Sequence, residues 1–398
     1  MENLATASAA GIHSLATPAR PSRSNTRVIA LDALRGLAVM GMILVVSPGS
    51  WNYRLPMLNH APWHGYTLAD LVFPAFLFAV GVAIALGFRG DRPLGASVAR
   101  ILRRTLSLIG LGLLLNLLPA FDLANFRISG VLQRIGLCYG LAAIFVLMSA
   151  RAAGCTRYLD ATRVTVAAVT LLVGWALVLS FTSAPGFPVG DVSQAGTLGA
   201  WFDRQVITPA HMWPHGTDAA GAVVFDPEGI LSTFPALASV LIGVMCGQWL
   251  GKTPSMRLLK LGAGMGFALV LSGYLMSPLI VVNKWIWTPS FALVSSGWSL
   301  LAYCALHFAL QRSAGQAVLK PVLILGGNAI LAFVLCELLG KIAGIPVAGE
   351  SPQNFAFQTM LSMVNDPWMS SFLCALGVLG IILLVIWPLQ RRGIHIRL

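Results

Sequence analysis

The sequence predicts an all-α integral membrane protein, and three observations support this fold class. Of the 398 residues, 57% are hydrophobic and 10% are charged, whereas a soluble domain usually carries about 25% charged residues. The hydrophobic residues form runs of about 20, the length that a helix needs to cross a bilayer. Most basic residues fall in short segments between alternate runs. A chain of this composition cannot cover its surface with polar side chains, so most of that surface must face lipid.

The apolar runs predict a bundle of about ten transmembrane helices, which form one domain over residues 28–390. Residues 1–27 are rich in Ala, Ser, Thr, Pro and Arg, and we expect them to be disordered. Residues 391–398 are expected to form a basic tail. The predicted spans are 28–46, 67–88, 101–118, 130–148, 163–182, 231–250, 258–277, 288–310, 319–340 and 370–388.

The charge distribution predicts how these helices are oriented. With a cytoplasmic N-terminus, 20 of the 26 Lys and Arg residues fall on the cytoplasmic side and five on the opposite side. Because basic loops stay in the cytoplasm, both termini are predicted to be cytoplasmic. This pattern accounts for the net charge of +12, and the absence of a basic stripe with interleaved aromatic residues argues against nucleic-acid binding. Three long segments on the opposite side are where we expect a site: about 47–66, 183–230 and 341–369.

The densest cluster of reactive side chains lies at the start of the second span, in residues 59–74. His60 could take a proton from an attacking amine or hydroxyl, and Asp70 could hold its imidazole in one tautomer. Metal binding by His60 and His64 is a competing interpretation. Pro62 disfavours the regular helix that would put both imidazoles on one face, and no third ligand is evident. A plain interfacial loop with incidental histidines is the remaining alternative.

Polar residues inside the spans form a second group of candidates, because an uncompensated charge in the bilayer is costly. Asp32 and Arg35 lie three residues apart, hence on one helix face. They either neutralise each other or place Arg35 in a cavity where it meets phosphate. Gln133 and Arg134 open the fourth span. Arg134 needs an anionic partner there, either a cofactor pyrophosphate or a carboxylate of the protein.

Three further candidates lie near the later spans. Asn283 and Lys284 precede an aromatic stretch that begins at Trp285, and they form either part of a site or an interfacial belt. Asn328 follows two glycines in an apolar run, where an amide serves either a ligand or helix–helix contacts. Glu337 on the same span is expected to be a buried, hydrogen-bonded carboxyl group rather than a catalyst.

Several of these stretches form a recognisable series. They are LDALRG at 31–36, the His60 cluster, DLVFP at 70–74, GVLQR at 130–134, FDPEGIL at 225–231, NKWIW at 283–287 and GNA at 327–329. In this order, and over about residues 28–390, the sequence resembles the heparan-α-glucosaminide N-acetyltransferase family. The first stretch is shared with other membrane acyltransferases, whereas DPEGIL and VLQR are more specific.

The resemblance implies an acetyltransferase that moves acetyl from cytoplasmic acetyl-CoA to the amine of glucosamine, or of a glucosamine-containing sugar, across the membrane. It is closest to bacterial members, which implies a multi-pass protein of the bacterial inner membrane; a homodimer is a further expectation. His60 matches the active histidine, as general base or acetyl carrier, with Asp70 beside it. No metal is expected. The candidates for contacting acetyl-CoA or the acceptor are Asp32, Arg35, Gln133, Arg134, Asn283, Lys284 and Asn328.

Two positions depart from the family pattern. His64 stands where the lysosomal enzyme has an asparagine, so no catalytic role is assigned to it. Ser47 stands where the family often has an asparagine, a difference that bears on how the acceptor is oriented. The competing functional interpretation is a transporter of N-acetylglucosamine or a related sugar, in which tryptophans stack on the sugar while His60 and Asp70 relay protons.

Overall fold

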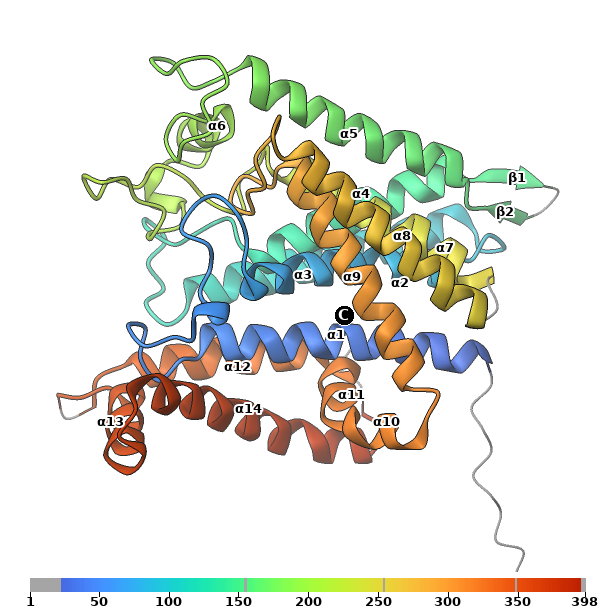
Figure 1. Cartoon of the computed structure of the whole chain (residues 1–398). Helices are drawn as coiled ribbons and strands as arrows, with labels where there is room; N and C mark the ends of the chain where they lie inside the picture. The colour runs from blue at the N-terminus through green and yellow to red at the C-terminus, as the bar shows by residue number, and fades with distance from the viewer. Residues whose placement is uncertain (1–22, 154–155, 253–254, 348, 395–398) are drawn as a thin grey trace, which may run out of the picture.

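The computed structural model describes residues 23–153, 156–252, 255–347 and 349–394, and this part of the chain is almost entirely helical (Figure 1). Within it, the only strands are β1 (Arg151–Ala153) and β2 (Thr156–Tyr158), which pair in antiparallel fashion. Two short 3-10 helices, η1 (Pro56–Leu58) and η2 (Pro209–His211), lie in the connections. The α-helices are α1 (Arg23–Val46), α2 (Leu68–Gly87), α3 (Leu94–Leu117), α4 (Val131–Ser149), α5 (Ala161–Phe181), α6 (Leu198–Val206), α7 (Thr233–Lys252), α8 (Ser255–Met276), α9 (Pro289–Ala309), α10 (Ser313–Val318), α11 (Lys320–Gly327), α12 (Ala329–Gly344), α13 (Pro352–Val364) and α14 (Pro367–Arg391).

The all-α membrane fold is confirmed, and the described residues contain eight or nine candidate spans where about ten were predicted. Among the described residues, eight helices are long and apolar enough to cross a membrane: α1, α2, α4, α5, α7, α8, α9 and α14. Helices α11 and α12 qualify together as a ninth span, bent by 89° at the break between them. The predicted span at 101–118 falls in α3, which is 24 residues long but carries Arg100, Arg103 and Arg104. These three guanidinium groups make α3 too polar to count among the apolar helices.

The connections between helices gather at two opposite ends of the bundle (Figure 1). The three long segments predicted to share a side, 47–66, 183–230 and 341–369, come together at the left of Figure 1, and we call this the loop end. The opposite end carries the connection between α2 and α3, with Arg89 and Arg92, the β1–β2 pair, and the connection between α9 and α11. We call it the basic end. The two ends therefore differ in character, with long loops at one and basic connections at the other.

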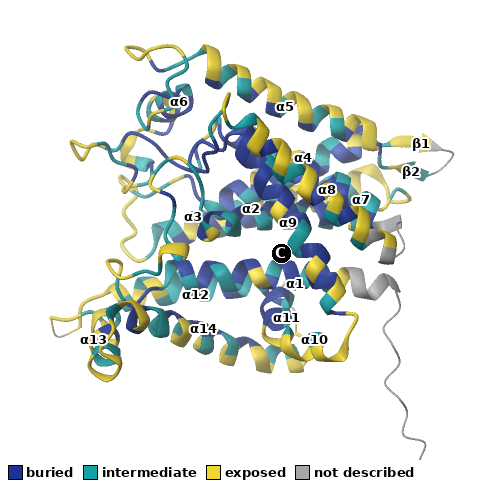
Figure 2. Cartoon of the chain, in the orientation of Figure 1, coloured by how far each residue is buried: buried dark blue, intermediate teal, exposed yellow. Residues whose placement is uncertain are grey.

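The helices differ in how much of their surface is buried by the protein itself (Figure 2). In α7 and α9, 67% of the apolar span is buried, against 17% in α8 and 22% in α5 and α14. The outer helices expose large apolar side chains such as Val173, Phe267 and Leu384. Because a soluble protein rarely exposes so many apolar side chains together, α5, α8 and α14 are best explained as the lipid-facing periphery.

Helix α1 lies between two packed groups of helices. One of its faces packs against α2, α7 and α9, and the other against α11, α12 and α14. At the crossing of α1 and α11, a Cβ added at Gly36 would lie 1.8 Å from the carbonyl oxygen of Val322, and one added at Gly326 would lie 1.8 Å from that of Asp32. Both glycines, one from the 31–36 stretch and one just before Asn328, are thus required by close backbone packing.

Candidate active site

A cavity of about 620 Å³ runs along α1 and is walled by α2, α3, α4, α11 and α12. Its lining includes Val28 and Val46, which are separated by about 27 Å along a helix that rises about 1.5 Å per residue. His60, Trp213 and Lys284 line it at the loop end. The volume is in the usual range for small-molecule sites. The cavity therefore extends through most of the length of the bundle and reaches the predicted catalytic histidine.

His60 and Asp70, which the sequence predicts as a pair, lie in direct contact. The Nδ1 atom of His60 is 2.7 Å from Oδ1 of Asp70. Asp70 is buried at the third position of α2, in a capping box with Thr67. Its Oδ2 accepts hydrogen bonds from the backbone N–H groups of Thr67 (2.8 Å) and Ala61 (3.0 Å). An ionised carboxylate only accepts, so Nδ1 carries the proton and Nε2 keeps a lone pair for chemistry.

Lys284 completes this cluster from a segment more than 200 residues away. Its Nζ lies 3.3 Å from Asp70 Oδ1 and 3.2 Å from His60 Nδ1, and 4.5 Å from the ring centroid of Trp285. The Nε1–H of Trp285 donates to the carbonyl oxygen of Ala61 at 2.8 Å, which ties this segment to the His60 loop. The buried ammonium is therefore held by a carboxylate and an aromatic face.

The surroundings of His60 favour its neutral form. Burial lowers the pKa of His60; the hydrogen bond to Asp70 acts in the opposite direction, and the charge of Lys284 lowers this pKa further. Burial also lowers the pKa of Lys284, against the raising effect of Asp70. Because a depressed pKa leaves the imidazole unprotonated at neutral pH, His60 can accept a proton there.

A second charged cluster lies beside the first at the loop end. Arg127 donates to Asp226 through Nε (3.0 Å) and Nη2 (2.6 Å), and Nη2 also donates to Glu228. The buried Asp226 accepts a further hydrogen bond from the backbone N–H of Trp213 at 2.7 Å. Burial opposes the charge on Arg127, but Glu228 and Asp226 outweigh it and raise its pKa. Arg127, Glu228 and Trp213 all line the cavity.

The sequence did not single out this second cluster. Glu228 lies in the FDPEGIL stretch, which enters the family resemblance as a whole and without a role for this glutamate. Arg127 was one loop charge among others. One feature of the sequence points to this cluster. Few basic residues occur on the predicted far side of the membrane, and a buried one needs a carboxylate partner. The FDPEGIL stretch offers two carboxylates in a single loop.

Asp32 and Arg35 both line the cavity on α1. Arg35 Nη1 lies 3.2 Å from Asp32 Oδ1, and both side chains are partly exposed. The two interpretations of this pair are therefore compatible, because the pair neutralises itself while facing the cavity.

The remaining four candidates are buried, and their side chains are not part of the cavity lining described above. Gln133 Nε2 donates to the carbonyl oxygen of Ile128 at 3.1 Å. Asn283 Oδ1 accepts from the backbone N–H of Ile286 at 3.2 Å. Asn328 lies at the break between α11 and α12. These contacts shape the walls and turns around the cavity.

Arg134 has partners that the sequence did not predict. Its Nη2 donates to the carbonyl oxygen of Gly229 (2.8 Å) and to the hydroxyl of Ser232 (2.5 Å), and its guanidinium lies 5.7 Å from the ring centroid of Trp287. Instead of a carboxylate, a carbonyl, a hydroxyl and an aromatic face surround the charge. Arg134 thereby ties α4 to the end of the FDPEGIL stretch.

His64 contacts the amide side chain of Asn283. Its Nδ1 lies 3.3 Å from the Nδ2 of Asn283. Across the described ranges of the chain, no three His, Cys, Asp or Glu side chains gather as a metal site would require. Ser47, the other position that departs from the family pattern, lies 3.4 Å from Cys336 Sγ through its hydroxyl.

Comparison with known proteins tests the family indicated by the sequence motifs. The family model for the catalytic region of heparan-alpha-glucosaminide N-acetyltransferase matches residues 27–193. The human heparan-alpha-glucosaminide N-acetyltransferase is 30% identical over 258 residues, covering 56% of this chain and 38% of that protein. The mouse protein of the same name is 26% identical over 360 residues, covering 79% of this chain and 54% of that protein. This chain thus spans about half or less of these curated relatives. The family model matches residues 27–193, which carry His60 and Asp70, so the comparison agrees with the resemblance that the motifs indicated.

Proposed function

We propose that the protein is a transmembrane N-acetyltransferase of the bacterial inner membrane. Acetyl-CoA enters from the basic end, on the cytoplasmic side, and its acetyl group is transferred at the loop end to the amine of a glucosamine-containing sugar. The assignment of sides follows the positive charge of the basic end. The observation that carries the proposal is the position of the His60–Asp70–Lys284 cluster at the loop end of a cavity that extends along α1 towards the basic end.

The lining of the cavity suits a thioester donor with a long arm and an anionic head. Apolar side chains such as Val72, Phe76 and Ile135 line its middle, while Arg35 and Arg104 lie toward the basic end. The apolar part fits the pantetheine arm, and the guanidinium groups fit phosphate oxygens. This arrangement supports acetyl-CoA as cosubstrate, with its reactive end at His60.

The proposed chemistry uses the free Nε2 of His60. The neutral amine of the sugar attacks the thioester carbonyl carbon and its nitrogen gives a proton to Nε2, while the C–S bond breaks and the CoA thiolate leaves with that proton. In the alternative order, Nε2 attacks the thioester carbonyl carbon and the C–S bond breaks as the CoA thiolate leaves; the amine then attacks the acetyl-imidazole, whose C–N bond breaks, and the amine proton passes to the thiolate. In both orders Asp70 stabilises the positive imidazole, which a buried carboxylate 2.7 Å away is suited to do.

The loop end also offers groups that suit a sugar acceptor. Trp213 and Trp285 both line the cavity, with ring centroids 5.6 Å apart and planes inclined by 24°. Glu228, held by Arg127, supplies a carboxylate that can accept hydrogen bonds from hydroxyl or amine groups. Aromatic faces with a few oriented polar groups are typical of small-molecule sites. We therefore place the acceptor against these residues.

The decisive test is acetyl transfer from labelled acetyl-CoA to glucosamine by the purified, detergent-solubilised protein. We expect His60→Ala to lower the rate by about 100- to 10,000-fold, the usual contribution of a general base, while acetyl-CoA still binds. His64→Ala is the matched control, because this nearby imidazole contacts Asn283 and not Asp70, and its rate should stay near that of the wild type.

The same preparation separates the enzyme from a transporter. If the wild type transfers no acetyl to any amino sugar, and proteoliposomes take up N-acetylglucosamine without acetyl-CoA, the transferase proposal is wrong. Acetyl transfer that requires His60, without acetyl-CoA-independent uptake, supports it.

A further inference from the structure

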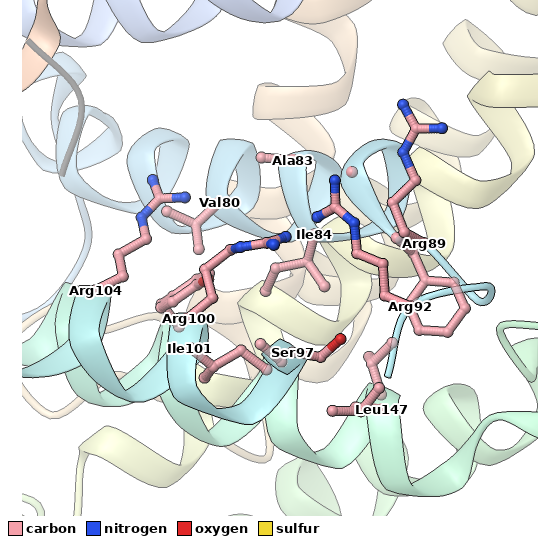
Figure 3. A pocket seen from close by; sticks show the side chains of 15 residues that line it. Val80, Ala83, Ile84, Arg89, Arg92, Ser97, Arg100, Ile101, Arg104 and Leu147 are labelled. Carbon is pink, nitrogen blue, oxygen red and sulfur yellow. The ribbon is translucent and has the colours of Figure 1, made fainter. Parts of the chain in front are cut away.

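A second pocket, of about 200 Å³, lies at the basic end between α2, α3 and α4 (Figure 3). Four arginines line it: Arg89, Arg92, Arg100 and Arg104. Figure 3 shows their side chains in a row along the pocket. Within the described part of the chain, no carboxylate forms a salt bridge with any of the four. Guanidinium groups gathered in this way repel each other unless an anion lies among them.

Arg104 joins this pocket to the long cavity. Arg104 and Val80 line both. The guanidinium of Arg104 lies 4.7 Å from the ring centroid of Tyr139, which positions it, while its Nε is buried and makes no hydrogen bond with the described residues. A buried donor without a partner is uncommon in proteins. Arg104 therefore has hydrogen-bonding capacity for a ligand that passes between the two spaces.

The spacing between His60 and this junction matches the arm of CoA. Asp70, which contacts His60, and Val80 are ten residues apart on α2, which is about 15 Å along the helix axis. About thirteen bonds separate the thiol sulfur of CoA from its nearest phosphorus, and at the spacing of an extended backbone these span roughly 15 Å. With the sulfur near His60, the first phosphate thus reaches the level of Arg104.

We propose that the arginine pocket binds the phosphate groups of the nucleotide end of CoA. The pyrophosphate lies at Arg104, and the 3′-phosphate lies among Arg89, Arg92 and Arg100. Arginine forks bind phosphate oxygens in pairs, with both charge and geometric fit. Arg35 is a weaker site, because Asp32 already pairs with it. This proposal rests on the proposed function and adds to it the residues that hold the donor.

Anionic lipid headgroups present the same phosphate chemistry at a cytoplasmic membrane face. The experiment therefore uses the full chain in nanodiscs of phosphatidylcholine alone, and it measures the affinity for CoA, 3′-dephospho-CoA and pantetheine by calorimetry. The pocket variant is Arg100→Gln combined with Arg104→Gln. The control is Arg103→Gln, which removes one positive charge from the same helix but lies outside the pocket lining.

We expect the pocket variant to bind CoA at least tenfold more weakly than the wild type, and the Arg103→Gln variant to stay within about twofold. Pantetheine should bind all three proteins equally. In a second variant, Arg89→Gln with Arg92→Gln, the wild-type preference for CoA over 3′-dephospho-CoA should disappear. An unchanged thermal unfolding midpoint shows that each variant is folded.

Equal CoA affinity in the pocket variant and the Arg103→Gln control overturns the proposal, even if the wild type transfers acetyl, and the proposed function then stands without it. In parallel nanodiscs that also contain phosphatidylglycerol, loss of bound phosphatidylglycerol by the pocket variant with no loss of CoA affinity also overturns the proposal and identifies a lipid site. If the pocket variant loses CoA affinity but the wild type acetylates no amino sugar, the pocket assignment holds and the proposed function falls.

Discussion

The two ends of the long cavity both carry clustered charge, but they differ in how that charge is compensated. At the loop end, Lys284 pairs with Asp70, and Arg127 pairs with Asp226 and Glu228. At the basic end, Arg104 lines the cavity and also the adjoining pocket with Arg89, Arg92 and Arg100, and no carboxylate of the described residues forms a salt bridge with these four arginines.

This difference agrees with the roles that we propose for the two ends, acetyl transfer at the loop end and binding of the donor at the basic end. Paired and buried charges are held in one geometry, which suits proton transfer and acceptor positioning. Cationic groups that lack a protein partner are instead ready for an anion that arrives and leaves with each turnover. In the function that we propose, the charges with permanent partners belong to the reaction centre, and the arginines without a carboxylate partner belong to the entrance for the donor.

The largest expected effect comes from Asp70→Asn at the loop end. The amide cannot stabilise the imidazolium of His60, and it favours the wrong tautomer, so acetyl transfer should fall by about a thousandfold or more. The measurement is the rate at saturating acetyl-CoA beside acetyl-CoA affinity, which should change little. A variant that keeps at least a tenth of the wild-type rate would show that the pairing of His60 with Asp70 is not catalytic.

Asp226→Asn is expected to have the next largest effect, on stability. It leaves the partly buried Arg127 with Glu228 alone, and loss of one partner of a buried ion pair costs about 3 kcal/mol. Denaturant unfolding in detergent measures this change. Asp122→Asn is the control, since Asp122 is an exposed carboxylate on the α3–α4 connection that also carries Arg127, and this substitution should cost less than about 0.5 kcal/mol. Similar values for both variants would contradict the role of the buried cluster.

The pH dependence of acetyl transfer should distinguish the two ends further. His60 acts as a base only when neutral, and its pKa lies below the ordinary value of 6.5, so the acidic limb of the rate should fall below pH 6.5. The rate should also rise as pH approaches the pKa of the sugar amine. Lys284→Met removes a charge that lowers the pKa of His60 and should move the acidic limb to higher pH, whereas Arg92→Gln should leave it in place. A flat profile from pH 6 to 9 would argue against amine activation.

The smallest expected effect is on stability at the basic end. Arg92→Gln and Arg100→Gln remove exposed charges that have no salt bridge in the structure, so each should change the free energy of unfolding by less than about 0.5 kcal/mol. A loss of more than 1 kcal/mol in the same denaturant assay would mean that these arginines have structural partners, and the contrast between the two ends would then fail.

The sequence predicted the fold class and most helices because membrane insertion depends on local composition. Runs such as 67–88 and 370–388 correspond to α2 and α14 within a few residues. The predicted span 101–118 corresponds to α3, which is not among the apolar helices because it carries Arg100, Arg103 and Arg104. The 89° break after Gly327 was also not predicted, because a bend inside an apolar run depends on what packs around it.

In the candidate site, the sequence alone determined the pairing of His60 with Asp70. Their separation of ten residues is closed by the turn that caps α2, so local rules were sufficient. Only the tertiary structure decided that Lys284 joins them from 224 residues away and that Arg127 meets Asp226 from 99 residues away. It also decided that Arg134 and Asn328 are buried outside the lining of the cavity. The physical reason is that hydropathy and capping act over a few neighbouring residues, whereas a buried charge selects its partner from whatever the packed helices bring within a few ångströms.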